Sequence, residues 1–378
     1  MNRLPLWTSL AALAVSVVLL VVITQANIRP TAPAQPVPTA QSQTSSTAGG
    51  SAAVNTSGPS SATSSLAASA TTAPNGSARR QSRSVSEAQT LLPPAPQPPT
   101  ANFTAASAQL RAALVNIMCY APASSSLHSI SGSGVIIDSK GIILTNAHVA
   151  QYFLLADQGV TCVIRSGSPA TDQYEAKLEY LSPAWVAENT GVLTERLPTG
   201  TGEHDYALLA ITSSATEQPL PAYFPAIPLA SAPPRQGSDV VIASYGAQFL
   251  NTVQIQTDLF PTVVYGSVKG VFTFATTSVD VLALGGSAAA QEGSSGGGVA
   301  NGESQLAGLI TTSTVTGATA SRSLNAITAS YIRADYAAQT GSSLEALLAQ
   351  DPASAVQAFA QQIPALESAV LGTTQPTQ

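Results

Sequence analysis

Charged residues are the scarcest feature of this sequence. Lys, Arg, Asp and Glu make up 9% of its 378 residues, against roughly 25% in typical soluble domains. The 14 basic residues are outnumbered by 20 acidic ones, which gives a net charge of -6 and leaves no basic stripe for DNA or RNA. Nucleic-acid binding is therefore excluded. The low charge, together with 27 Gly and 26 Pro, favours a protein that works outside the cytoplasm.

Cysteine is also scarce, since the chain has only Cys119 and Cys162. Two cysteines are too few for a disulfide scaffold, and their spacing is not that of a metal site. We therefore expect neither a metal ion nor another cofactor. Each cysteine lies in a β-like run, "LVNIMCY" or "VTCVIRS". Two alternatives stay open, one disulfide in an oxidising compartment or two buried free thiols.

The N-terminus carries the longest uncharged stretch, from Leu4 to Thr24. It has about the ~20 residues that a helix needs to cross a bilayer, whereas a cleavable signal usually has a shorter apolar core. Its length favours an uncleaved membrane anchor over residues 1–26, although Thr24-Gln25-Ala26 is an acceptable signal cleavage site. We expect the rest of the chain outside the cytoplasm, anchored to the membrane, or secreted if the segment is cleaved.

Residues 27–103 contain scarcely any aromatic side chain and are rich in Ser, Thr, Ala and Pro. A segment of this composition cannot bury enough apolar surface to offset the entropy lost on ordering. We therefore expect a disordered linker, with an end-to-end distance of about 50 Å if it behaves as a flexible coil.

Short β-branched runs begin after residue 103 and recur as far as about residue 332. The stretch "SGVIIDSKGIILTNAHVA" predicts two strands joined by a tight turn at Ser139-Lys140-Gly141. "TCVIRSG" and "YEAKLEYL" predict a hairpin, and "RSLNAITASYI" predicts the last strand. Many short strands without long helices between them favour an all-β barrel or sandwich, with the proline-rich residues 213–237 crossing between two halves.

The tail, residues 336–378, has helical rather than strand spacing. The pattern is broken near Asp351-Pro352, because proline cannot continue a helix. We therefore predict one or two helices at the C-terminus.

Histidine is rare enough, at three residues, to narrow the search for a catalytic base. A nucleophilic serine needs a base, an acid that orients the base, and amide donors for the oxyanion. His148 lies in "LTNAHVA" at the predicted end of a strand, and Asp205 lies in "EHDYALLAI" at the start of another. Ser295 lies in "EGSSGGG", where Gly293 can turn its own N–H and that of Ser295 into one concavity.

The other two histidines, His128 and His204, are rivals for the base, and we interpret both as exposed loop residues. Taken singly, each of the three candidate catalytic residues also has an ordinary structural explanation. Their occurrence in order within one β-rich segment favours catalysis.

Three motifs resemble those of the trypsin/chymotrypsin-like serine endopeptidases, and specifically of the HtrA/Deg-type branch. They are "SGSGVIID" with "GIILTNAHV", then "DYALLAI", then "GSSGGGVAN" with "LAGLIT", and the match spans roughly residues 110–335. The resemblance implies two antiparallel six-stranded β-barrels with the active site in the cleft between them. It also implies protein or peptide substrates and a possible homo-oligomer.

By the same resemblance, each site residue receives a role within a protease domain of residues 104–335. His148 would be the general base and then the general acid, with Asp205 as its orienting partner. Ser295 would be the nucleophile, and Gly293 and Ser295 would donate the N–H groups of the oxyanion hole. A protein of the same fold that binds peptides or envelope proteins without cleaving them is the alternative, and the presence of all three catalytic residues argues against it.

The sequence departs from the family pattern in several places. Ser294 stands where digestive relatives carry an aspartate that receives a freed N-terminus, so we expect no zymogen of that kind. Ala289 would lie at the base of the primary substrate pocket, which favours small or medium apolar side chains. Residues 181–203 form an expected insertion, either over the cleft or at its rim. After Ile332 too few residues remain for the PDZ domain that HtrA proteins often carry.

Overall fold

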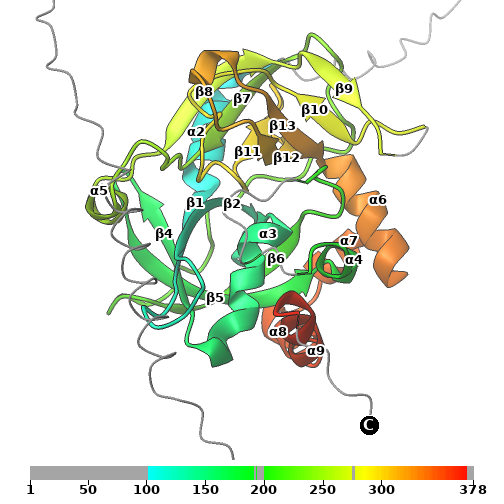
Figure 1. Ribbon diagram of the computed structural model, residues 1–378. Helices are drawn as coiled ribbons and strands as arrows, with labels where there is room; N and C mark the ends of the chain where they lie inside the picture. Colours follow the sequence, from blue (N-terminus) through cyan, green and yellow to red (C-terminus); the bar gives the residue numbers. More distant parts are fainter. Residues whose placement is uncertain (1–100, 191–192, 194–199, 275–276, 373–378) are drawn as a thin grey trace, which may run out of the picture. The chain divides into compact units, whose positions relative to one another are not determined.

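The computed structural model describes residues 101–190, 193, 200–274 and 277–372 (Figure 1). The expected anchor or signal segment, residues 1–26, and the expected linker up to residue 100 lie outside the described residues. Within the described part, every helix is too short or too polar to cross a membrane.

The first half of the fold is a closed six-stranded antiparallel barrel, as the sequence predicted. Its strands follow the order β1-β2-β3-β6-β5-β4 around the barrel. Their bounds are β1 (Leu114–Tyr120), β2 (Ile130–Asp138), β3 (Ile142–Thr145), β4 (Thr161–Gly167), β5 (Ala170–Leu181) and β6 (Ala207–Ser214). The predicted turn joins β2 to β3, and Gly141 takes a positive φ of 90° there. Because glycine has no Cβ, it adopts this conformation at little cost.

The second half is a seven-stranded antiparallel sheet, so the prediction of a second six-stranded closed barrel is wrong in this detail. The sheet order is β8-β7-β11-β12-β13-β10-β9. The strands are β7 (Asp239–Ser244), β8 (Thr262–Ser267), β9 (Gly270–Phe272), β10 (Val281–Ala283), β11 (Gly298–Ala300), β12 (Leu306–Ser313) and β13 (Leu324–Thr328).

The chain bends between β8 and β9, and this bend accounts for the difference. The Val268 N–H donates to the Ser238 carbonyl, whereas the next N–H, that of Lys269, donates to the Ala283 carbonyl. One run that reads as a single strand is thereby split in two. The first part, β8, pairs with β7, and the second part, β9, pairs with β10. The two parts are therefore the two edge strands of the sheet.

An N-terminal helix, α2 (Phe103–Ala113), precedes the barrel and was not predicted. The Asn102 side chain caps it by accepting a hydrogen bond from the Ala105 N–H, as asparagine often does at this position. Leu110 is fully buried. The helix contacts β2 of the barrel as well as β7 and β11 of the sheet, so it packs against both halves (Figure 1).

Four helices follow the last strand in the described residues 329–372, rather than the predicted one or two. They are α6 (Ala329–Thr340), α7 (Leu344–Leu348), α8 (Pro352–Ala360) and α9 (Ile363–Val370). The predicted break at Asp351-Pro352 is confirmed, because the Asp351 carboxylate caps α8 by accepting from the Ser354 N–H. The last strand ends earlier than predicted, because the Thr328 side chain caps α6.

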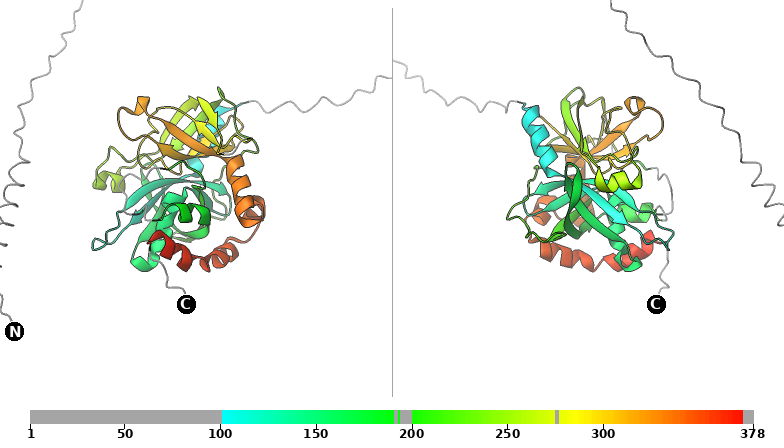
Figure 2. Two further views of the ribbon diagram at one scale, coloured as in Figure 1. Left: turned by 45° about the vertical axis from the view of Figure 1, so that its right-hand side comes forward. Right: turned by 90° about the vertical axis from the view of Figure 1, so that its left-hand side faces the viewer.

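These helices bring the C-terminal part of the chain back to the barrel. Figure 2 shows α6 descending from the sheet along one side of the molecule, with α8 and α9 beneath the barrel. Helix α8 packs on β5, and α9 packs on α4 (Pro183–Glu188). Trp185 and Val186 of α4 are buried, so the described part of the 181–203 segment is anchored in the core.

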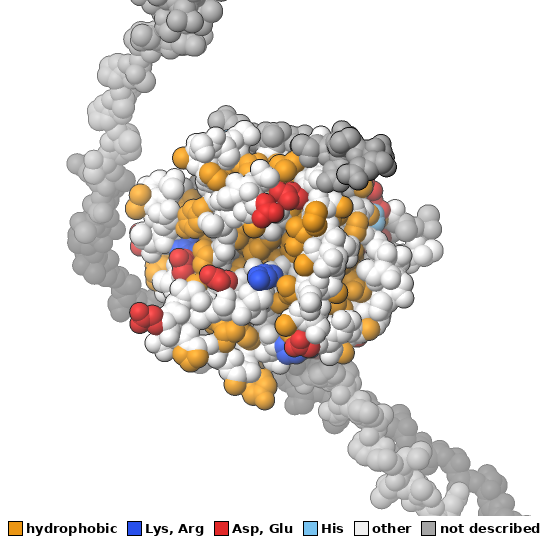
Figure 3. Space-filling model, turned by 90° about the horizontal axis from the view of Figure 1, so that it is seen from below, with side chains coloured by type: hydrophobic (Ala, Val, Ile, Leu, Met, Phe, Trp, Pro, Cys, Tyr) orange, Lys and Arg blue, Asp and Glu red, His pale blue; other side chains and the backbone are white. Residues whose placement is uncertain are grey.

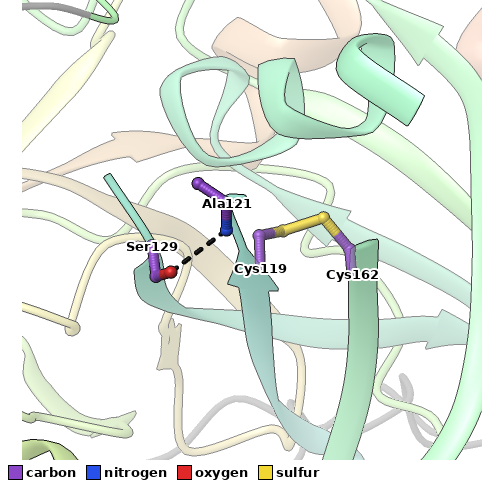
Figure 4. The surroundings of a disulfide bond; sticks show 4 residues. All are labelled: Cys119, Ala121, Ser129 and Cys162. Atoms are coloured by element: carbon purple, nitrogen blue, oxygen red, sulfur yellow. Dashed lines mark hydrogen bonds between the residues drawn. A yellow bond between two sulfur atoms is a disulfide. The ribbon is translucent and has the colours of Figure 1, made fainter. Parts of the chain in front are cut away.

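Cys119 and Cys162 face each other across the β1–β4 ladder and form a disulfide with an S–S distance of 2.02 Å (Figure 4). Of the two alternatives that the sequence left open, the structure has the bridged one. Beyond the end of β1, the Ala121 N–H donates to the Ser129 hydroxyl at 3.1 Å, which closes the loop toward β2.

Candidate active site

His148 lies on a single-turn helix, α3 (Ala147–Ala150), directly after β3. The chain continues into the 3₁₀ helix η1 (Gln151–Gln158), so the predicted bend after the strand is a helical turn. The Gln151 side chain donates to the His148 carbonyl at 2.8 Å. The Asn146 side chain donates to the Asp205 carbonyl at 2.9 Å and ties the two ends of the site together. The His148 side chain is 26% exposed, so solvent and substrate can reach it.

The carboxylate of Asp205 holds His148 from two directions. One oxygen accepts from the His148 amide at 3.0 Å, and the other lies 2.8 Å from the ring Nδ1. The second oxygen also accepts from the Thr311 hydroxyl at 2.5 Å. Since Nδ1 is engaged, the remaining ring nitrogen, Nε2, is left to exchange a proton with a substrate or nucleophile. Sequence reasoning missed Thr311, which comes from β12, more than a hundred residues after Asp205.

The ionisation of this pair is coupled. Burial alone would lower the pKa of His148, but the charge of Asp205 and the hydrogen bond to it outweigh burial and raise that pKa above its usual value. Burial would raise the pKa of Asp205, but the charge of His148 and the hydrogen bonds from His148 and Thr311 lower it below its usual value. The acid therefore stays ionised while the base titrates.

The serine loop, residues 291–297, is attached to the barrel through its own backbone. The Ser133 N–H donates to the Ser295 carbonyl at 2.7 Å, and the Ser133 hydroxyl donates to the Gly293 carbonyl at 2.8 Å. The Gly296 N–H donates to the Ile310 carbonyl of β12 at 2.9 Å. The loop is thus held between β2 of the barrel and β12 of the sheet.

Gly296 lets this loop approach the strand that leads to His148. A Cβ atom at Gly296 would lie 2.5 Å from the Thr145 hydroxyl oxygen, closer than any real contact, and Thr145 is only three residues before His148. On the other side, the carbonyl that Gly296 binds belongs to Ile310, whose neighbour Thr311 binds Asp205. These two close approaches place the serine loop beside the strand that leads to His148 and beside the strand that carries Thr311.

The amide groups expected to form the oxyanion hole are available. Gly293 has a positive φ of 88°. The Glu292 carbonyl accepts from the Ala247 N–H at 2.8 Å. Because C=O and N–H point in opposite directions in a planar trans peptide, the Gly293 N–H faces away from Ala247. Within the described part of the chain, neither this N–H nor that of Ser295 donates a hydrogen bond, so both are free to bind an oxyanion.

Ser294 and Ser295 are adjacent but differ in accessibility. Ser294 is 1% exposed, and its hydroxyl accepts from the Ser244 hydroxyl at 3.0 Å. Ser295 is only partly buried, so of the two hydroxyl groups only that of Ser295 can meet a substrate. The expectation that the protein is not a zymogen of the digestive kind stays a prediction; the structure shows a neutral hydroxyl pair at Ser294.

Arg322 fastens the loops around the serine from within. Its guanidinium donates to the Ala290 carbonyl at 2.7 Å and to the Gln248 side-chain oxygen at 2.6 Å. It also donates to the Gly317 carbonyl at 3.0 and 2.8 Å. Arg322 is 5% exposed. It therefore links three loops from inside the protein: the loop after β7, the loop before the serine and the loop after β12. Sequence reasoning missed it, although it is the only basic residue between 270 and 332.

The remaining predicted site residues behave differently from one another. Ala289 is fully buried among the sheet's core residues, and its assignment to the substrate pocket stays a prediction. His128 is exposed. His204 lies in a loop, as predicted, but it is not exposed, because its side chain is only 19% exposed and Asp335 of α6 lies 2.8 Å from its Nδ1. Among the described residues, no group of His, Cys, Asp and Glu could hold a metal ion.

A comparison with protein families agrees with this architecture. Residues 132–309 match the family model of the trypsin-like peptidase domain. Among solved structures, the chain is similar to the active form of Rv3671c protease from M. tuberculosis, at 20% identity over 67% of this chain and 95% of that chain, with a TM-score of 0.40. It is also similar to the serine endoprotease from Yersinia pestis, at 23% identity over 65% and 69%, with a TM-score of 0.40. No curated protein matches. The matched span includes the predicted base, acid and nucleophile, so residues 132–309 are a trypsin-like peptidase domain, as expected of a serine endopeptidase.

Proposed function

We propose that the protein cleaves peptide bonds of proteins outside the cytoplasm, through a triad of Ser295, His148 and Asp205 and an acyl-enzyme intermediate. The main support for the proposal is that the Asp205 carboxylate makes two hydrogen bonds with His148, one to the ring at 2.8 Å and one to the amide at 3.0 Å. Such a hold fixes the tautomer that can accept a proton at Nε2.

In the proposed reaction, the Ser295 hydroxyl attacks the substrate carbonyl while His148 Nε2 takes its proton. The N–H groups of Gly293 and Ser295 bind the oxyanion that forms, and Asp205 stabilises the charged imidazole. His148 then gives the proton to the leaving amine, and a water molecule hydrolyses the acyl-enzyme by the same steps. Within the described residues, no hydrogen bond joins His148 to Ser295, and we expect it to form when substrate closes the site, as in other enzymes.

The substrate would bind as an extended strand along β12. At its end, Thr312 and Ser313 pair with β13 on one side, whereas β11 on the other side reaches only as far as Leu309. The open backbone edge of β12 beside Ser295 can receive a peptide by β-augmentation. The extracytoplasmic location and the HtrA/Deg-type assignment rest on the N-terminal segment and the motifs of the sequence.

A fluorophosphonate probe, which reacts with activated serines, tests the proposal. Wild-type protein should label rapidly, and Ser295→Ala should abolish labelling. Ser294→Ala is the matched control and should keep labelling, because that neighbouring hydroxyl is buried. Labelling that persists in Ser295→Ala would assign the nucleophile elsewhere. A folded wild-type protein that does not label would instead support a peptide-binding protein of the same fold.

A further inference from the structure

A cavity of about 430 Å³ lies outside the candidate active site, between the barrel and the C-terminal helices. Its walls include Glu179 and Tyr180 of β5, Tyr336 and Gln339 of α6, and Phe359 of α8. This volume is within the range of small-molecule sites, roughly 300–1,000 Å³. Figure 3 views the molecule from the side of α8 and α9, where hydrophobic and uncharged side chains prevail and charged ones are few.

Glu179 is the unusual member of this lining. Its side chain is 4% exposed, and within the described part of the chain one of its oxygens is fully buried without a hydrogen-bond partner. A buried carboxylate without a partner is costly. A ligand that supplies a donor and a positive charge would remove this cost.

The charges around Glu179 also favour a cation. Burial raises the pKa of Glu179 to about 7; Lys140 opposes this rise, and Asp138 and Asp351 add to it. The Lys140 ammonium group is already held by two backbone carbonyls, those of Leu348 and Gln350. The carboxyl groups of Glu179, Asp138 and Asp351 therefore outnumber the one nearby ammonium group, that of Lys140.

Aromatic rings form another part of the wall. The ring of Tyr180 lies 4.8 Å from that of Tyr336 and 6.4 Å from that of Phe359, measured between centroids. Aromatic faces attract organic cations, and the rings also accommodate an apolar stem. The Gln339 side-chain oxygen is occupied, because it accepts from the hydroxyls of Tyr180 and Ser182. Among the lining residues, Glu179 is the one that can carry a negative charge below the pH range of tyrosine.

We propose that this cavity binds a small primary alkylammonium ion, with its ammonium group at Glu179 and its apolar stem against the three rings. An anion would be repelled by the carboxylates, and a neutral apolar molecule would leave Glu179 unpaired. The site is independent of the proposed peptidase chemistry, so the two proposals can fail separately.

Calorimetric titration of the full chain, carrying Ser295→Ala to prevent self-cleavage, tests this proposal with 2-phenylethylammonium as the probe. We expect one saturable site and about tenfold tighter binding at pH 8 than at pH 6, because a carboxyl group with a pKa of about 7 ionises between these values. The uncharged 2-phenylethanol should not compete. Absence of binding at pH 8, or equal binding of the alcohol, would overturn the proposal.

Glu179→Gln should weaken binding at pH 8 by tenfold or more and remove its pH dependence. Glu175→Gln is the matched control, since Glu175 is exposed on the same strand, and it should leave the affinity unchanged. If Glu179→Gln fails to fold, Phe359→Leu keeps an apolar side chain but removes one ring, and several-fold weaker binding is expected. Unchanged affinity in whichever variant is folded would contradict the proposed site.

Discussion

His148 and Asp205 lie at the ends of β3 and β6 in the closed barrel, whereas Ser295 lies in a loop between two three-residue strands of the open sheet. The base and acid are fixed by side-chain hydrogen bonds to each other. The serine loop is fixed by backbone hydrogen bonds, by glycines that allow close approach, and by Arg322.

This difference separates two kinds of vulnerability. In the barrel half, chemistry depends on particular side-chain atoms, so even an isosteric substitution at Asp205 should be severe. In the serine loop, catalysis depends on the backbone conformation. A substitution there should therefore reduce activity where the added side chain forces the backbone to move. Thr311 connects the two halves of the site, because it lies on β12 of the sheet and its hydroxyl donates to Asp205.

Asp205→Asn should have the largest effect among the substitutions of this comparison, a loss of about 10⁴-fold in kcat, as in the general triad precedent. The amide cannot stabilise the charged imidazole and favours the wrong tautomer of His148. Thr311→Val removes only one of the hydrogen bonds to the carboxylate and should cost far less, on the order of tenfold. Steady-state kinetics on a peptide substrate measure both. Equal losses for the two variants would show that the carboxylate acts only as a structural anchor.

Gly293→Ala should cost about 10²–10³-fold in kcat, the usual cost of one oxyanion donor. The added Cβ would lie 2.7 Å from the Tyr245 carbonyl at a φ of 88°, so the peptide must move and its N–H with it. Gly237→Ala is the matched control, since Gly237 has a φ of 86° but no atom within 4 Å of an added Cβ. If both variants lost activity equally, the backbone strain and not the oxyanion hole would be responsible.

Arg322→Met should lower kcat by about tenfold or more by loosening the three loops around the serine, since buried hydrogen bonds from a charged group stabilise by roughly 1.5–3 kcal/mol. The pH dependence should not change, because Asp205 and His148 are untouched. Arg333→Met is the control: Arg333 also binds backbone carbonyls, those of Leu229 and Ala230, but away from the serine loop. An acid limb that shifts in Arg322→Met would contradict the separation of the two halves.

The pH profile of kcat/KM reports the barrel half alone. His148 must be neutral to accept the serine proton, and Asp205 raises its pKa. Activity should therefore fall as pH drops through a value above the usual ~6.5, by about tenfold for each further pH unit. A profile that stays flat down to pH 4 would rule out His148 as the base.

Local signals in the sequence were sufficient for the features that depend on neighbouring residues. The turn at Ser139-Lys140-Gly141 and the helix start at Asp351-Pro352 are encoded by glycine, proline and a capping carboxylate. The division of the tail into four helices was also readable in part, because Ser343 is a capping residue just before α7.

Features that depend on distant partners could not be read in this way. The split between β8 and β9 depends on which carbonyls Val268 and Lys269 meet. The partial burial of His204 depends on Asp335, 131 residues later, and the contacts of Arg322 join three separate loops. The sequence shows that such residues exist but not which groups they will meet.

The pairing of Cys119 with Cys162 was another such undecided feature, and removing it should affect stability rather than catalysis. The β1–β4 ladder that holds the bridge lies across the barrel from the β3–β6 ladder that carries His148 and Asp205. The bridge closes a loop of 43 residues, so replacing both cysteines with alanine should lower the free energy of unfolding by about 4 kcal/mol, measured by denaturant titration in the Ser295→Ala background. In the otherwise wild-type chain, kcat at 25 °C should stay within about twofold, since the fold remains populated. A loss of kcat in a fully folded double variant would mean that the far wall of the barrel does position the base, and that the two halves of the site are less independent than their contacts indicate.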